Sequence, residues 1–156
     1  MSKQELKQKG FTIIEVVLVL AIAALIFLMV FIALPALQRN QRDTQRRQDA
    51  GRFISQLSSY ATNNKGSVPT APGQLTTFKD NYLKSSAGEF NDPTTGKAYE
   101  ISLATSISSA PGNVGDMVYA PGYVCNGESL QSANGSTRQA AVVVKLEGSG
   151  NNCQNT

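Results

Sequence analysis

A run of nineteen apolar residues near the N-terminus, residues 16–34, constrains this chain more than any other feature of its sequence. A helix rises about 1.5 Å per residue, so the run would extend for roughly 28 Å, close to the thickness of the hydrocarbon core of a bilayer. The run therefore predicts a membrane-spanning helix. A single carboxylate, Glu15, stands directly before it. That carboxylate either reaches water at the membrane edge or has a partner, because a charge inside a membrane is costly.

Three other interpretations of the run explain less of the sequence. A secretory signal peptide cleaved after Ala21-Ile22-Ala23 would contain Glu15 in its apolar core and leave eleven apolar residues beyond the cut. A plain single-pass anchor explains the length of the run but neither Gly10 nor Glu15. A buried helix of a soluble protein does not explain the length.

The residues before the run form a signal of their own. A polar leader with three lysines ends at Gly10, and Phe11-Thr12-Ile13-Ile14-Glu15 then opens the apolar run. This pattern resembles the class III signal peptide of type IV pilins and pseudopilins. The resemblance implies that a prepilin peptidase cuts between Gly10 and Phe11 and methylates the new amine of Phe11. It also implies that Glu15, four residues beyond that amine, guides the addition of subunits to a filament.

The resemblance and the residue pattern together divide the chain into four parts. They are a leader peptide (1–10), a transmembrane and assembly helix (11–34), an amphipathic continuation of that helix (35–64) and a head (65–156). Apolar residues return in the continuation at the spacing of an amphipathic helix: Ala50, Phe53, Ile54, Leu57, Tyr60 and Ala61. Pro35 either kinks or breaks the helix or marks its exit from the membrane.

Residues 38–49 form a polar stretch with no apolar member. Its residues favour a helix, and Asp43 and Arg47 have the i,i+4 spacing of an ion pair. A helix that is polar all round is either solvated or paired with something outside the chain. The sequence leaves both alternatives open: a solvated stalk that touches lipid headgroups, or a subunit contact in a filament.

The head is expected to be an α+β domain in which the long helix packs on a small antiparallel sheet. The sequence predicts a short helix at 74–83, a turn at 91–96, and strands at 98–103, 117–119 and 140–146. The second strand could continue through Pro121-Gly122 to Cys125. If the second and third strands pair, Cys125 and Cys153 can meet and form a disulfide, which an exported domain favours. Two reduced, buried cysteines are the alternative.

The chain lacks the residues on which most catalytic sites depend. It contains no histidine and none of the nucleotide-binding, hydrolase or zinc-protease motifs. We therefore expect no enzymatic activity, no cofactor and no metal. Asn91 and Asp92, with Glu89 nearby, would suit a calcium loop, but the EF-hand spacing is absent and a plain turn is favoured. The glycosylation pattern Asn134-Gly135-Ser136 is likewise better read as a turn.

Charge sets further limits on partners and orientation. The net charge of the chain is +3, which indicates no specific nucleic-acid partner. Basic residues flank the apolar run on both sides, so the positive-inside rule hardly distinguishes the two possible membrane orientations. The residues concerned are Lys3, Lys7 and Lys9 before the run and Arg39, Arg42, Arg46 and Arg47 after it. The pilin resemblance decides the orientation: it implies a single-pass protein of the cytoplasmic (inner) membrane with a cytoplasmic N-terminus and an external head.

These observations predict a structural subunit of a type IV pilus-like extracellular filament. Its partners would be copies of itself or other pilins, prepilin peptidase, a pilus assembly platform and membrane lipid. A pseudopilin of a type II secretion or DNA-uptake machine is the alternative within the same class. Outside it, the alternative is a membrane-tethered binding module that never assembles.

Overall fold

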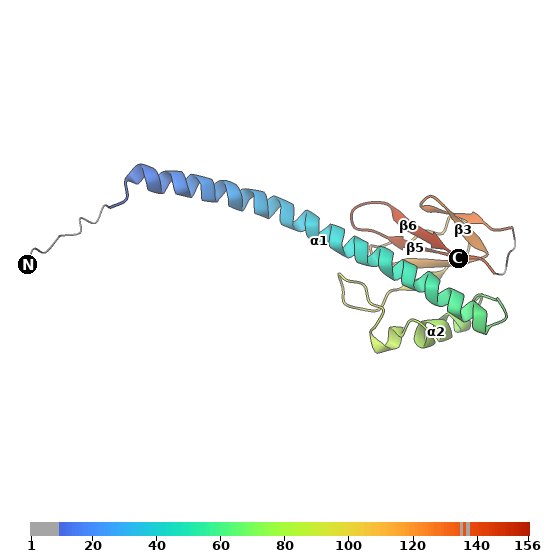
Figure 1. The fold of residues 1–156 in the computed structure, drawn as a ribbon. Helices are drawn as coiled ribbons and strands as arrows, with labels where there is room; N and C mark the ends of the chain where they lie inside the picture. The colour runs from blue at the N-terminus through green and yellow to red at the C-terminus, as the bar shows by residue number, and fades with distance from the viewer. Residues whose placement is uncertain (1–9, 135, 137) are drawn as a thin grey trace, which may run out of the picture. The chain divides into compact units, whose positions relative to one another are not determined.

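The computed structural model describes residues 10–134, 136 and 138–156, and Figure 1 follows them from the first helix to the last strand. The leader before Gly10 and the Gly135 of the glycosylation pattern lie outside the described residues. The chain divides into two compact units, of which the first ends at Gln38 and the second is Arg39–Thr156. Helix α1 (Ile13–Asn63) contributes residues to both units.

The first unit is the apolar part of α1. The helix continues through Pro35, so the proline does not break it. Every described residue of this unit is exposed except Ala23, which is half-buried. The large apolar side chains are among the exposed ones, for example Leu25 at 68% and Phe31 at 74%. This surface is apolar all round, as expected of a helix that is covered by lipid or by other helices.

The described residues of the second unit form the rest of α1, two short helical elements and six strands. The helical elements are α2 (Pro72–Asn81) and the 3-10 turn η1 (Ser85–Ala87). The strands are β1 (Ile101–Leu103), β2 (Met117–Pro121), β3 (Tyr123–Asn126), β4 (Ser129–Ser132), β5 (Ala140–Lys145) and β6 (Asn151–Asn155). They form a four-stranded sheet in the order β1-β2-β5-β6 and a separate hairpin of β3 and β4.

The main core lies between the helices and one face of the four-stranded sheet. Phe53 of α1 is fully buried and contacts Phe78 of α2 and Tyr119 of β2, with ring centroids 5.2 and 5.4 Å away. The alternate residues Ala140, Val142 and Val144 of β5 complete this face. The helical periodicity at 50–61 and the short helix near 74–83 are thus confirmed, as is the α+β fold with a long N-terminal helix.

The sheet itself differs from the expectation in two respects. Strand β1 runs parallel to β2, with Ile101 opposite Met117, because the connection 104–116 returns the chain to the starting end of β1. Strand β6 was not predicted, since its sequence Asn-Asn-Cys-Gln-Asn has no apolar alternation. It pairs with β5 through its backbone and places Cys153 opposite Val143.

The predicted continuation of the second strand to Cys125 was wrong. Strand β2 ends at Pro121, and Gly122, at φ 80°, turns the chain into β3 of the other sheet. Leu130 of the β3-β4 hairpin then packs in a second, smaller core on the opposite face of the four-stranded sheet, against Ala141 and Val143.

Candidate processing and assembly site

The start of α1 is closed by two residues of the predicted signal. The backbone N–H and the hydroxyl of Thr12 both donate to Glu15 Oε2, at 2.8 and 2.9 Å. In return the backbone N–H of Glu15 donates to Thr12 Oγ1 at 3.4 Å. This is a capping box, in which a threonine and a glutamate three residues later satisfy each other's backbone donors. The spacing Thr-x-x-Glu is legible in the sequence and was overlooked there.

The predicted cleavage site precedes this cap. Gly10 and Phe11 lie before the first helical residue, Ile13, and both are exposed. A Cβ atom added to Gly10 would meet nothing within 4 Å, so the fold itself does not demand glycine there. The side chain of Phe11 is 88% exposed. The peptide bond between the two residues is therefore accessible to a peptidase.

The apolar part of α1 follows directly. In the described part of the chain, α1 is the one helix long and apolar enough to cross a membrane. Glu15 lies in its first turn and is the only acidic residue between Phe11 and Gln38. The arrangement thus joins an accessible Gly10–Phe11 bond, a capped carboxylate and an exposed apolar helix within one short segment.

Comparison with protein-family models finds the prokaryotic N-terminal methylation motif at residues 6–31. This chain carries the class III signal peptide of type IV pilins and pseudopilins. The motif supports a pilin-like precursor that is anchored in a membrane and processed by prepilin peptidase. No curated protein and no solved structure matches the chain.

A second group of charged residues lies in the head, around Arg46 of α1. Its guanidinium is fully buried and donates to Asp43 Oδ1 at 2.9 Å, to Asp92 Oδ1 at 2.8 Å and to Glu147 Oε1 at 2.9 Å. It also donates to Thr94 Oγ1 at 2.6 Å, and this hydroxyl donates to Glu147 in turn. We call these five residues the Arg46 cluster.

Two further contacts extend the Arg46 cluster. The guanidinium of Arg42 donates to both carboxylate oxygens of Glu147, at 2.8 and 2.7 Å. Asp43 accepts the backbone N–H groups of Glu147 and Gly148 in the turn between β5 and β6. The cluster therefore fastens three segments of the head together: α1, the 91–96 turn and the β5-β6 turn.

These contacts favour the ionised form of two carboxylates, those of Glu147 and Asp43. Arg42 lowers the pKa of Glu147 far below its ordinary value; burial opposes this, and hydrogen bonds from Thr94 and Arg46 reinforce it. Burial by itself would raise the pKa of Asp43, but the N–H groups of Glu147 and Gly148, together with Arg46, outweigh it and the pKa falls. The cluster is thus a set of charges that satisfy one another within one subunit.

The Arg46 cluster corrects two predictions for residues 38–49. Asp43 pairs with Arg46, not with Arg47, because Asp43 and Arg46 face the head whereas Arg47 is exposed. The inward face of the stretch is neither a solvated stalk nor a filament contact, since its partners belong to the same chain. The spacing Asp43, Arg46, Ala50, Phe53 extends the apolar face by one turn and could have revealed this.

The predicted turn at 91–96 is confirmed. Asp92 Oδ2 accepts the N–H groups of Thr94 and Thr95, each at 3.0 Å, while its other oxygen accepts Arg46. Both oxygens of Asp92, which a calcium loop would use, therefore already accept hydrogen bonds within the chain, in line with the plain turn that the sequence favoured. Within residues 10–134, 136 and 138–156, no group of three or more His, Cys, Asp or Glu side chains is arranged to hold a metal ion.

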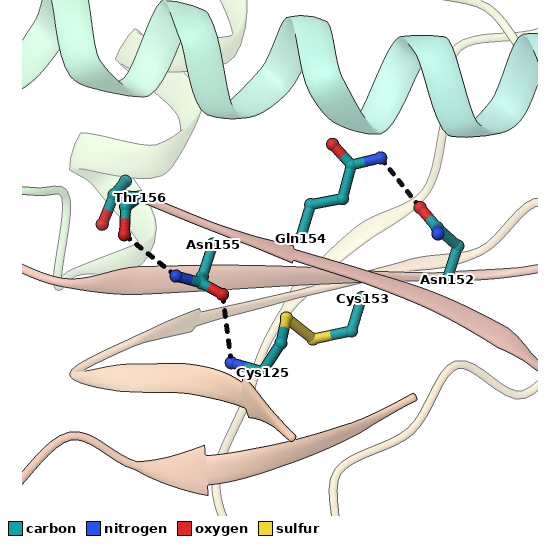
Figure 2. Close-up of a disulfide and its surroundings, with 6 residues drawn as sticks. All are labelled: Cys125, Asn152, Cys153, Gln154, Asn155 and Thr156. Carbon is teal, nitrogen blue, oxygen red and sulfur yellow. Dashed lines mark hydrogen bonds between the residues drawn. A yellow bond between two sulfur atoms is a disulfide. The ribbon is translucent and has the colours of Figure 1, made fainter. Parts of the chain in front are cut away.

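Cys125 and Cys153 form a disulfide, with their Cα atoms 5.7 Å apart. Figure 2 shows the bond joining β3 to β6, beside the hydrogen bond from the Cys125 N–H to Asn155 Oδ1. The disulfide thus ties the β3-β4 hairpin to the edge of the four-stranded sheet. It does not lie at the end of β2, where the sequence placed Cys125.

Proposed function

We propose that this protein is a structural subunit of a type IV pilus-like extracellular filament. Prepilin peptidase would cut between Gly10 and Phe11, and an assembly platform would then draw the subunit from the cytoplasmic membrane, where its N-terminus faces the cytoplasm and its head faces out. The methylation motif supports the processing step. The observation that carries the proposal is that the apolar part of α1 is exposed all round and yet carries a carboxylate in its first turn.

The exposed apolar helix needs a cover in every state of the protein. Lipid covers it in the membrane pool. In a filament the same side chains would pack against copies of α1. Each Å² of apolar surface that this packing keeps from water stabilises the filament by about 25 cal/mol. The role is structural, and no enzymatic step is proposed for the head.

Glu15 supplies the specificity of this packing. Cleavage leaves a positive amine on Phe11, at the start of an apolar helix. Two unit charges 4 Å apart attract by about 1 kcal/mol in bulk water and by about 4 kcal/mol at an effective dielectric constant of 20. A contact between Glu15 and the Phe11 amine of a neighbouring subunit would therefore strengthen as the helices exclude water. Glu15 is the acceptor that the segment offers for that amine.

The processing step is tested by direct N-terminal sequencing of the protein from its native host. The mature chain should begin with methylated phenylalanine at position 11. Gly10→Val should block cleavage, because the peptidase must accommodate a branched side chain in place of a hydrogen. Mature protein of normal size from Gly10→Val would contradict the proposal. A block in this variant could not be attributed to misfolding, because the fold has room for a side chain at Gly10.

The assembly step is tested by comparing sheared filaments with the membrane pool in Glu15 variants. Glu15→Val should keep membrane insertion and cleavage but lower filament yield at least tenfold, the effect of about 1.4 kcal/mol. Glu15→Asp should retain part of the yield, because the charge survives on a shorter side chain. A wild-type filament yield from Glu15→Val would mean that the carboxylate only faces water. A wild-type host without filaments would favour a tethered binding module.

A further inference from the structure

The hydrogen bonds of the Glu15 carboxylate are distributed unevenly. Both donors of Thr12, the backbone N–H at 2.8 Å and the hydroxyl at 2.9 Å, converge on Oε2. Among the residues that the structure describes, none donates to Oε1. The carboxylate is therefore anchored by one oxygen and open at the other.

We infer that Thr12 is a positioning residue for assembly: it fixes Glu15 through Oε2 so that Oε1 is presented to the Phe11 amine of a neighbouring subunit. The inference rests on the proposed function and deepens it. A glutamate has three side-chain torsions, and fixing them before assembly reduces the entropy that is lost when the ion pair forms. The cap thus prepares the acceptor before the neighbour arrives.

Cleavage leaves this arrangement intact. The donors are the hydroxyl of Thr12 and the N–H of the Phe11–Thr12 peptide bond, which remains an amide after the Gly10–Phe11 bond is cut. The new amine appears one residue earlier, on Phe11. The same carboxylate can therefore keep its own cap at Oε2 and accept a second, charged donor at Oε1, as a carboxylate with two oxygens allows.

The arrangement also lowers the cost of waiting in the membrane. An isolated carboxylate at the edge of an apolar segment is costly, and hydrogen bonds to its charged form reduce that cost. Two donors from Thr12 provide this within a single subunit. Glu15 is thereby tolerated before assembly and remains able to bind a partner during it.

Four variants of the full-length chain separate positioning from simple helix capping. Thr12→Val has nearly the same shape but lacks the hydroxyl, and Thr12→Ser keeps the hydroxyl. The side chain of Thr12→Asp is a good helix cap but, being ionised, cannot donate a hydrogen bond to a carboxylate. Thr44→Val removes an exposed threonine of α1 and serves as the matched control, because the Thr44 side chain bonds only the backbone O of Asn40 among the residues that the structure describes.

Cleavage is scored first, and sheared filaments are then expressed per mature subunit. We expect Thr12→Val and Thr12→Asp each to lower this yield about fivefold, a typical effect of losing one hydrogen bond, here the bond from the Thr12 hydroxyl to Glu15 Oε2, while Thr12→Ser and Thr44→Val stay within twofold of wild type. A wild-type yield from Thr12→Val would overturn the inference. So would a wild-type yield from Thr12→Asp, because it would reduce Thr12 to a helix cap.

A second measurement distinguishes failure of this inference from failure of the proposed function. Hydrogen exchange at the Thr12 amide, in full-length protein in detergent micelles, reports the cap without any filament. Exchange should be slow in wild type and Thr12→Ser and at least fivefold faster in Glu15→Val, where the acceptor is lost. Equal rates in wild type and Glu15→Val would overturn the inference alone. A slow wild-type rate in a protein that forms no filament would refute the proposed function and leave only the cap.

Discussion

Glu15 and Arg46 are both charged residues of α1, and their surroundings differ. Arg46 is fully buried in the head and donates to three carboxylates and a hydroxyl, all from its own subunit. Glu15 is exposed, and the described residues donate to its carboxylate only at Oε2. A charge whose partners lie in the same chain serves the stability of that chain. A charge that is only half satisfied within its chain is suited to binding another molecule.

The comparison predicts that the two sites fail in different ways when they are changed. Variants of the Arg46 cluster should lower the stability of the head, whereas variants at Glu15 should leave that stability unchanged and alter assembly. Unfolding measurements on the full chain in detergent test the first half of this statement, and filament yields test the second.

Arg46→Met should have the largest effect on the head. It leaves the buried carboxylates of Asp43 and Asp92 without their cation, and removing one partner of a buried ion pair costs about 3–5 kcal/mol. The free energy of unfolding in denaturant titrations should fall by that amount. The control is Arg47→Met on the neighbouring, exposed arginine, which should change the value by less than about 0.5 kcal/mol. Equal losses in the two variants would remove the distinction between the buried and the exposed arginine.

Loss of the disulfide should come next. Cys125 and Cys153 are 28 positions apart, and closing a loop of that size stabilises a fold by about 3–4 kcal/mol in the chain-entropy model. The double variant Cys125→Ser, Cys153→Ser should lose roughly this amount, while single-residue changes at Glu15 should lose none. Non-reducing mass spectrometry of freshly exported protein provides the control, and two free thiols there would contradict the bond.

How much the sequence foretold depends on the range of the contacts involved. The membrane helix and the processing signal are local patterns, so residues 10–34 could be interpreted directly. The Arg46 cluster could not, because Asp92 and Glu147 lie 46 and 101 positions from Arg46 and no local pattern pairs them. Only the spacing of Arg46 with Ala50 and Phe53 hinted at its burial.

The sheet shows the same limit. Strand β5 is a run of apolar residues and was predicted, but β6 is polar and is a strand only because β5 supplies its backbone partners. The pairing of Cys125 with Cys153 was predicted correctly but for a partly wrong reason, since the prediction placed Cys125 at the end of the second strand. The bond instead joins β3 to β6, and neither of these strands was predicted as a separate element.

The smallest predicted effect concerns Glu147 and pH. Its pKa in the folded head is lowered, as is that of Asp43, so both stabilise the head above their unfolded values of 4.5 and 3.8. This stabilisation begins to be lost as the pH falls below those values and is gone once the pH lies below the lowered pKa values of the folded head, because protons bind more readily to the unfolded chain. At pH 7, Glu147→Gln should lower the free energy of unfolding by about 2 kcal/mol, the worth of hydrogen bonds to a charged group.

The difference between wild type and Glu147→Gln should shrink as the pH falls below about 4, because the Glu147 carboxylate of the unfolded wild-type chain takes up a proton there while that of the folded head stays ionised. Glu100→Gln is the matched control, since Glu100 is exposed and its side chain makes no hydrogen bond in the described residues. The free energy of unfolding of Glu100→Gln should change with pH in the same way as that of wild type. A difference between Glu147→Gln and wild type that stays constant from pH 7 to pH 3 would show that Glu147 acts through its shape and not its charge. The contrast between the two sites would then fail, because it assumes that both act through charge: the Arg46 cluster through charges paired within the chain, and Glu15 through a carboxylate with one oxygen left for another subunit.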